Sequence, residues 1–224
     1  LKFITVLILN YIKRKYNKKL EEGIVKSQNE IKLWHNEILG KRLVENLKKN
    51  HFDAEYFATK EEATEEILNR IPREATVGIA GSWTLKEMNL SEAIQNRGNI
   101  IYDHSREGLS KEKALEIRYK ELDSDVFLTS TNAITIDGQL VNKDGAGNRV
   151  AAMIFGPKKV IIIVGTNKIT DNIEAALERI ESTAAPMNNK RLNTGNPCVK
   201  AGQCVDCSSD VRICNITTII HKRP

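Results

Sequence analysis

Val160-Ile-Ile-Ile-Val164 is a run of five consecutive β-branched residues in a chain of 224 residues. A strand that is apolar at every position is typical of the centre of a parallel sheet, where both faces are covered. Working outward, the sequence predicts further strands at residues 52–58, 75–80, 99–103 and 126–129, with helical segments between them. Strands that alternate with helices imply βαβ units. The expected fold class is therefore α/β, with a three-layer, mostly parallel sheet between helices.

Capping boxes mark the starts of two predicted helices. In each box, a Ser or Thr lies three residues before a Glu, so that side chains and backbone amides can bond reciprocally. The pairs are Ser27 with Glu30 and Thr59 with Glu62. After the first box, apolar residues recur at helical spacing and predict a buried helix face formed by Ile31, Trp34, Ile38, Val44 and Leu47.

A β-hairpin is predicted over residues 134–141, where the Asp137-Gly138 pair lies between two apolar stretches. Asp-Gly suits a two-residue type I′ turn, because Gly and Asp are among the few residues found at its positive φ angles. The hairpin adds an antiparallel element to the otherwise parallel sheet.

Composition and charge exclude several classes of protein. The chain is 41% hydrophobic and 28% charged, which is ordinary for a globular domain, and no apolar run approaches the roughly 20 residues that a membrane-spanning helix needs. The net charge of +5 comes from two basic ends, while residues 27–189 are mildly acidic, which argues against nucleic-acid binding. We expect a basic N-terminal extension at residues 1–26, an α/β domain at 27–190 and a Cys-rich tail at 191–224.

Three polar segments follow predicted strands, at the sheet edge where α/β proteins bind ligands. In chain order they are residues 78–84, 129–132 and 144–149. In the first, Gly81 allows close backbone approach and Ser82 leads into a helix N-terminus, which favours anions. In the third, Arg149 can grip a carboxylate or phosphate bidentately. Turn chemistry explains each segment singly, but together they predict a site for a small carboxylate or phosphorylated ligand. The expected ligand-binding residues are Gly81, Ser82, Thr84, Ser130, Thr131, Asn132, Asp144, Gly145, Gly147, Asn148 and Arg149.

No catalytic constellation stands out in the sequence. His104 follows the predicted strand at 99–103 and is either an acid–base group at the same edge or an ordinary loop histidine. Trp34 and Trp83 are expected to be core anchors. The catalytic residues are therefore left unassigned.

All four cysteines lie in the tail, with the spacing Cys-x5-Cys-x2-Cys-x6-Cys. The absence of cysteines elsewhere argues against a secreted, disulfide-stapled fold and favours a reducing compartment. The Cys204 and Cys207 pair can chelate one metal ion from a single turn, and Cys198 and Cys214 complete four thiolate ligands. Four thiolates suit an iron–sulfur cluster or zinc, and the spacing does not separate the two. Disulfides or free thiols are the alternative.

Several motifs together resemble the LUD-domain family, the lactate-utilisation proteins of the LutC/YkgG kind. The stretch Gly81-Ser-Trp-Thr-Leu-Lys-Glu-Met-Asn-Leu90 is similar to a family motif in which Gly usually stands where this chain has Asn89. The strand and hairpin of residues 125–141, the loop of 144–149 and the segment of 156–165 resemble later family motifs. The resemblance extends from about residue 29 to 219, and the Cys-rich tail is similar to that of a single-domain branch of the family.

The resemblance implies a fold related to ribose-5-phosphate isomerase and CoA transferases, the NagB/RpiA/CoA-transferase-like fold. It implies a cytoplasmic role in lactate or related organic-acid utilisation, within a lactate dehydrogenase-type redox system that includes iron–sulfur partner proteins. The tail is then expected to hold an iron–sulfur cluster. The alternative is a non-enzymatic ligand-binding or regulatory subunit with a structural zinc site. A sugar-phosphate isomerase is a third candidate, suggested by the fold alone, and a homo-oligomer remains open.

Overall fold

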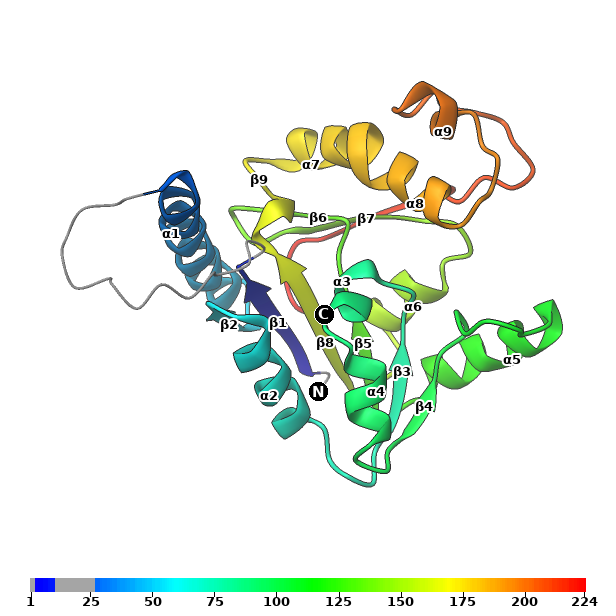
Figure 1. The fold of residues 1–224 in the computed structure, drawn as a ribbon, viewed down its shortest axis with the longest axis horizontal. Helices are drawn as coiled ribbons and strands as arrows, with labels where there is room; N and C mark the ends of the chain where they lie inside the picture. The colour runs from blue at the N-terminus through cyan, green and yellow to red at the C-terminus, as the bar shows by residue number, and fades with distance from the viewer. Residues whose placement is uncertain (1–2, 11–26) are drawn as a thin grey trace.

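The computed structural model describes residues 3–10 and 27–224, which form two sheets with helices around them (Figure 1). The main sheet has six parallel strands in the order β2-β1-β8-β5-β3-β4. Their bounds are β1 Phe3–Leu9, β2 Asp53–Phe57, β3 Thr76–Ile79, β4 Ile100–Tyr102, β5 Val126–Thr129 and β8 Lys159–Gly165. The α/β class and the parallel sheet are confirmed.

Strand β1 is an interior strand of the main sheet, between the edge strand β2 and β8. Register pairs join all seven of its residues to β8 and five of them to β2. Six of its seven residues are buried. Residues 3–9 thus belong to the α/β sheet, which corrects the expectation that all of residues 1–26 form an extension outside it. Residues 11–26 of that expected extension lie outside the described residues.

The main sheet is the middle layer of three, because successive side chains of each strand point to opposite faces. On β1, Ile4, Val6 and Ile8 pack with α1 (Gln28–Lys49), α6 (Asn148–Ile154) and part of the second sheet. Leu7 and Leu9 pack in the opposite core, which is covered by α2 (Lys60–Arg70), α3 (Trp83–Glu87) and α4 (Leu90–Gln95). Helix α5 (Lys111–Leu122) lies against α6, β3 and β4.

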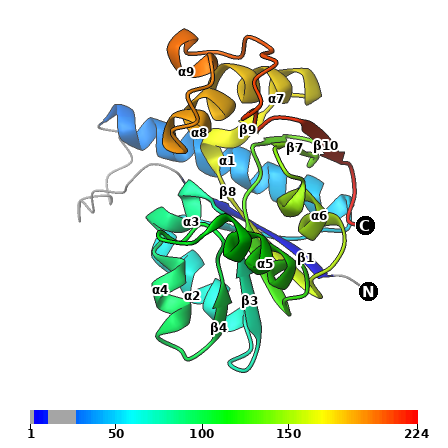
Figure 2. The ribbon, with the colours of Figure 1, turned by 90° about the vertical axis from the view of Figure 1, so that its right-hand side faces the viewer.

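The second sheet has four strands in the order β10-β7-β6-β9. It comprises β6 (Ala133–Thr135), β7 (Leu140–Asp144), β9 (Ile169–Thr170) and β10 (Ile216–Ile220), and α7 (Ile173–Arg179) covers one face. Figure 2 shows α7, α8 (Ala185–Arg191) and α9 (Cys198–Ala201) together above it. The tail is thus tied to the body, because β10 pairs with β7 along its whole length.

The predicted domain boundary near residue 190 falls at the end of a continuous helical segment. Helix α7 passes through a π-helical turn (Ile180–Ala184) into α8, which ends at Arg191. Pro186 lies at the start of α8 and has no N–H to donate to the preceding turn, which accounts for the local change of helical pitch.

The predicted hairpin is confirmed, but its turn is not of type I′. Strands β6 and β7 pair antiparallel, and the Thr135 amide donates to the Gln139 carbonyl oxygen at 3.0 Å. Gly138 has a φ of +85°, whereas Asp137 has no positive φ, so only one of the two residues takes the conformation that type I′ requires. The end of α1 presses on this turn, where Asn50 Nδ2 donates to the Asp137 carbonyl oxygen at 2.8 Å.

Asn89, at the family's usual glycine position, has a φ of +53°. Asn tolerates this left-handed conformation better than most non-glycine residues do. Asn89 is also the residue that precedes α4, so the chain keeps the bend between α3 and α4 without the glycine.

The first half of α1 departs from the predicted burial. Ile31, Trp34 and Ile38 are 51%, 61% and 51% exposed, and Trp83 is 60% exposed, so neither tryptophan is a core anchor. Because α1 has 22 residues and the strand beneath it only seven, the helix is longer than the sheet that it covers. Although α1 is long, no helix in the described part of the chain is apolar enough over a sufficient length to cross a bilayer.

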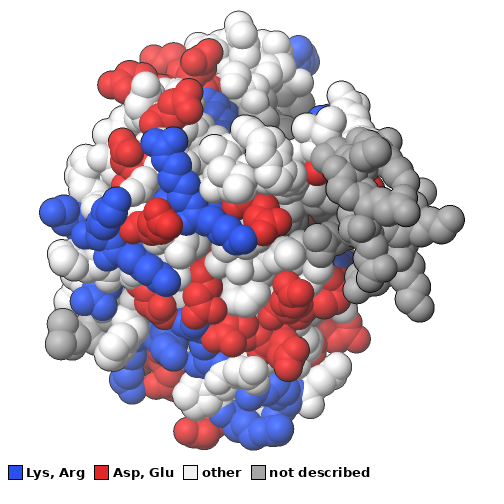
Figure 3. Space-filling view, turned by 90° about the vertical axis from the view of Figure 1, so that its left-hand side faces the viewer, with Lys and Arg blue, Asp and Glu red and all other residues white. Residues whose placement is uncertain are grey.

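Charges of both signs are interspersed on the face that α1 and α2 present (Figure 3). The largest ion-pair cluster there centres on Arg70, which contacts Asp53, Glu55 and Glu66. Surface charges in this arrangement neutralise one another, and this face does not form a field of one sign.

Candidate functional site

The carboxyl ends of three adjacent strands bring the first two predicted segments together. Strands β8, β5 and β3 are neighbours in the main sheet, so the residues that follow them share one edge. Thr84 follows β3, Ser130 follows β5, and Lys168 follows β8. The ammonium nitrogen of Lys168 lies 2.7 Å from Ser130 Oγ and 3.2 Å from Thr84 Oγ1, and so connects all three strand ends.

Lys168 is the strongest electrostatic feature of this edge. Its surroundings remove water from the ammonium group, and the nearby charges of Arg179 and Arg149 oppose its protonation. These effects lower the pKa of Lys168 from 10.5 to about 7, with burial as the largest cause, while Glu87 acts in the opposite direction. The residue still keeps part of its surface exposed.

Arg149 has a different place from the one expected. Its Nη1 donates to the Ser130 carbonyl oxygen at 3.1 Å, and its Nη2 donates to Asn132 Oδ1 at 3.0 Å and to the Lys143 carbonyl oxygen at 2.9 Å. Its Nε lies 3.1 Å from Asp144 Oδ2. All three guanidinium nitrogens are thus engaged by the protein, and Arg149 fastens β5 to β7 while adding positive charge to the edge.

Two further arginines come from the helices above the edge. Arg179 Nη1 donates to the Asn132 carbonyl oxygen at 2.6 Å, and its Nε donates to the Asn167 carbonyl oxygen at 3.1 Å. Arg191 lies 3.5 Å from the Gly81 carbonyl oxygen, so α8 reaches the first predicted segment. Burial lowers the pKa of both arginines. The edge therefore carries an excess of positive charge that is partly removed from water.

The Gly-rich loop of residues 144–149 packs against the C-terminal tail in this structure. A Cβ atom at Gly145 would lie 3.1 Å from the Ile213 Cα, and one at Gly147 would lie 2.9 Å from the Ile216 Cδ1. Gly147 has a φ of +84°, and its amide donates to Asp144 Oδ1 at 2.9 Å. The two glycines thus allow the tail to approach β7.

The remaining predicted residues take local roles. Ser82 precedes α3 but makes no capping hydrogen bond, and α3 has only five residues. Thr131 is buried, where its hydroxyl bonds to the Ala133 and Val141 carbonyl oxygens, and Asn148 begins α6. His104 contacts the buried Glu121 through Nδ1 at 2.7 Å, and not the residues around Lys168.

The four cysteines of the tail are all free thiols. Cys198 is buried, and burial followed by the charges of Cys207, Cys214 and Cys204 raises the pKa of its thiol. The four sulfurs thus lie within electrostatic reach of one another, and their donor chemistry fits a thiolate-bound metal. Within residues 3–10 and 27–224, however, no three Cys, His, Asp or Glu side chains are arranged as ligands of one ion.

Arg212 holds the cysteine loop in place. Its Nη1 donates to the Cys207 carbonyl oxygen, and its Nε donates to the Cys214 carbonyl oxygen at 3.4 Å. A cavity of about 20 Å³, roughly the size of one water molecule, lies between this loop and the edge of β7. Cys214 of the cysteine loop and Asn132 of the carboxyl edge of the sheet both line this cavity, so the loop lies next to the edge that holds Lys168.

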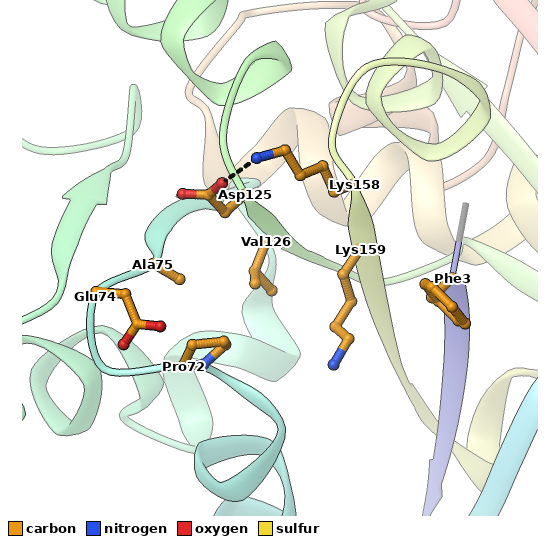
Figure 4. A pocket seen from close by; sticks show the side chains of 8 residues that line it. All are labelled: Phe3, Pro72, Glu74, Ala75, Asp125, Val126, Lys158 and Lys159. Carbon is orange, nitrogen blue, oxygen red and sulfur yellow. Dashed lines mark hydrogen bonds and ion pairs between the residues drawn. The ribbon is translucent and has the colours of Figure 1, made fainter. Parts of the chain in front are cut away.

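A larger cavity of about 320 Å³ lies at the opposite, amino edge of the main sheet (Figure 4). There Lys158 pairs with Asp125 at 2.8 Å and, with hydrogen bonds from Thr76, lowers the pKa of Asp125 to about 2. Lys159 donates to the Arg70 carbonyl oxygen at 3.0 Å. Asp125 raises the pKa of Lys158, so this lysine stays charged, in contrast to Lys168.

Sequence reasoning missed Lys168, Arg179 and Arg191. Lys168 had a usable signal, because it is the first basic residue after the apolar run of 160–164 and so had to lie near the carboxyl edge. Arg179 lay on a predicted helix and Arg191 at the start of the expected tail, and nothing in the sequence distinguishes either from a surface residue.

The fold and this edge define an α/β protein with a parallel sheet whose carboxyl ends gather a desolvated lysine among arginines. The chain belongs to the LUD-domain family: the family's sequence model, described as LUD domain, matches residues 40–224. This membership relates the protein to lactate utilisation. No curated protein and no solved structure matches the chain.

Proposed function

We propose that the protein acts in lactate or related organic-acid utilisation, and that its carboxyl edge binds a small carboxylate. Membership of the LUD-domain family supports the first part. The second part rests on Lys168, whose ammonium is desolvated near Arg149 and Arg179. Arg149 is paired with Asp144, whereas no carboxylate of the described residues lies at ion-pair distance from Lys168. An anion placed there offsets the unfavourable burial of positive charge. A phosphorylated ligand offers the same charge, and is the second candidate.

Ligand binding is expected to raise the thermal midpoint of unfolding. A ligand that binds only the folded state stabilises it by about 2.7 kcal/mol at 100 times its dissociation constant, which raises the midpoint of a domain of this size by roughly 5–10 °C. The screen compares lactate, pyruvate, acetate and inorganic phosphate. The proposal predicts a shift with at least one carboxylate, lost in Lys168→Met and kept in Lys32→Met, which removes an exposed lysine of α1. A flat response of the unaltered protein to all four anions contradicts it.

We also propose that Cys198, Cys204, Cys207 and Cys214 hold an iron–sulfur cluster. Their freedom from disulfides and their mutual electrostatic reach support this assignment. Such a cluster supplies one-electron transfer. The alternative is structural zinc in a non-enzymatic subunit, which closes a small lobe without redox activity.

Anaerobic purification of the full chain separates these alternatives. A brown protein with broad visible absorption and matched iron and sulfide is expected, because thiolate-bound clusters are coloured whereas zinc is not. Cys207→Ser is expected to lose the colour and most of the iron, and the neighbouring exposed Ser208→Ala to keep both. Stoichiometric zinc without iron favours the structural alternative, and absence of both metals contradicts metal binding by the tail.

A further inference from the structure

Lys168 has the surroundings of a reactive amine. Its Nζ contacts two hydroxyl oxygens, Ser130 Oγ and Thr84 Oγ1. Ser130 Oγ also donates its hydrogen to the Ile163 carbonyl oxygen at 2.6 Å. The hydroxyl hydrogen of Ser130 is therefore already used, and its oxygen accepts a hydrogen from Lys168, which fixes the direction of the amine.

We propose that Lys168 is a nucleophile that condenses with the carbonyl carbon of a 2-oxo acid to form an imine. The inference rests on the proposed binding of a small carboxylate at this edge, and names the substrate class. A lysine is active in this way when it is desolvated or lies beside another cationic group. Both conditions are met here, by burial and by Arg179 and Arg149.

The protonation state suits this chemistry near neutral pH. An ordinary lysine with a pKa near 10.4 is almost wholly protonated at pH 7 and has no electron pair to donate. The pKa of about 7 leaves roughly half of the Lys168 amine neutral at that pH. The groups that set this balance are Arg149, Arg179 and Glu87, since the direct contacts of Lys168 are the two hydroxyls.

The condensation balances without an oxidant or a reductant. The nitrogen electron pair of Lys168 forms a bond to C2 of the acid, and the carbonyl oxygen takes a proton to give a carbinolamine. The nitrogen–carbon double bond then forms as that oxygen leaves with a second proton as water, and the two protons that the oxygen takes balance the two that the attacking nitrogen releases. Thr84 is placed to pass a proton to the leaving oxygen, because among the described residues its hydroxyl bonds only to Lys168.

The positive charge of the edge selects a carbonyl compound that carries a carboxylate. Arg179 uses Nε and Nη1 on two backbone carbonyl oxygens, and no described residue accepts a hydrogen bond from its Nη2. That nitrogen is the donor that we assign to the substrate carboxylate. In a 2-oxo acid the carboxylate is bonded directly to the reacting carbon, so one compact ligand satisfies both groups.

Reductive trapping tests the inference on the full chain. The protein is incubated with pyruvate and cyanoborohydride at pH 7.5, and the modified peptides are identified by mass spectrometry. We expect N-(1-carboxyethyl)lysine at Lys168, formed at least tenfold faster than at any other lysine. Lactate, which has no carbonyl group, is expected to give no adduct. An equal spread of adducts over the surface lysines overturns the proposal.

Two variants separate trapping from binding. Lys168→Arg keeps the positive charge but cannot form the imine, so it is expected to lose the adduct while pyruvate still raises its unfolding midpoint. Lys32→Met is expected to be trapped like the unaltered protein. A pyruvate-induced midpoint shift in the unaltered protein without any adduct at Lys168 overturns the nucleophile but leaves carboxylate binding standing. Absence of both the shift and the adduct overturns the nucleophile, and carboxylate binding is overturned as well if lactate, acetate and phosphate also give no shift.

Discussion

Replacing Lys168 with Met is expected to stabilise the protein by roughly 3 kcal/mol at pH 6, and to have little effect by pH 9. Lowering the pKa of Lys168 from 10.5 to about 7 means that the folded state opposes protonation of this amine. At about 1.4 kcal/mol per pKa unit, the folded state carries a penalty of roughly 5 kcal/mol when the amine is charged. The two hydrogen bonds of the ammonium group offset about 2 kcal/mol of it.

The pH dependence follows from the protons that each state binds. Between pH 7 and 10.5 the unfolded chain holds a proton on Lys168 that the folded protein has released, so the stability of the unaltered protein rises with pH in that window. Below pH 7 both states are protonated and the whole penalty is present. The advantage of Lys168→Met therefore shrinks by about 1.4 kcal/mol per pH unit once pH exceeds 7.

Urea unfolding at pH 6, 7, 8 and 9 measures this difference. Lys32→Met serves as the control, because Lys32 is exposed on α1 and its removal is expected to change stability equally at each pH. A constant difference between Lys168→Met and the unaltered protein across the four pH values argues that Lys168 titrates as an ordinary lysine. A stabilising loss of a charged side chain is what a functional site predicts, since binding residues are retained at a cost to stability.

Much of the fold could be predicted because many of its elements are determined by short-range sequence patterns. The apolar run at residues 160–164 became β8, and both capping boxes appear with reciprocal hydrogen bonds at Ser27 and Thr59. The hairpin was correct, but its turn was not, because the end of α1 contacts it from far along the chain. The predicted burial of the first half of α1 was wrong for a related reason. Apolar residues at helical spacing identify one face of a helix, but not whether another element packs against that face.

The candidate site was predictable only in its location. The ends of predicted strands placed Thr84 and Ser130 at one edge, and the structure joins them through Lys168. The role of Arg149 could not be predicted, because it depends on Asn132 and Asp144 being close enough to engage the guanidinium group. Similarly, the sequence predicts a ligand-binding role for Gly145 and Gly147. Their contact with the tail becomes visible only in the folded chain, where β10 pairs with β7.

Strand β1 was missed because its partners are distant in sequence. It pairs with β2 and with β8, and only the assembled sheet shows that an apolar run near the start of the chain fills the space between them. The LUD-domain match begins at residue 40, so β1 also lies before the part of the chain that the family identifies. The strand is therefore the part of this fold that most needs a direct test.

A chain that starts at residue 27 is expected to lose cooperative folding. The deletion removes Ile4, Val6, Leu7 and Ile8, which have no exposed surface, and Leu9, which is 5% exposed. At about 1.5–3 kcal/mol for each buried aliphatic side chain, the loss is roughly 10 kcal/mol, comparable to the whole stability of a typical domain. The deletion also leaves the facing backbone groups of β2 and β8 without their partner strand.

The measurement is urea unfolding followed by near-ultraviolet circular dichroism, which reports fixed packing of aromatic side chains. The shortened chain is expected to give a weak signal and no sharp transition. In the full chain, Leu7→Asp is expected to act in the same direction, because it places a carboxylate in the core between β1, α2 and β3. Phe3→Asp is the matched control: it introduces the same charge into the same strand where the side chain is 58% exposed, and is expected to cost less than about 1 kcal/mol. If the shortened chain unfolds with an unchanged midpoint and cooperativity, β2 must pair with β8 directly, and the place of β1 between these two strands is wrong.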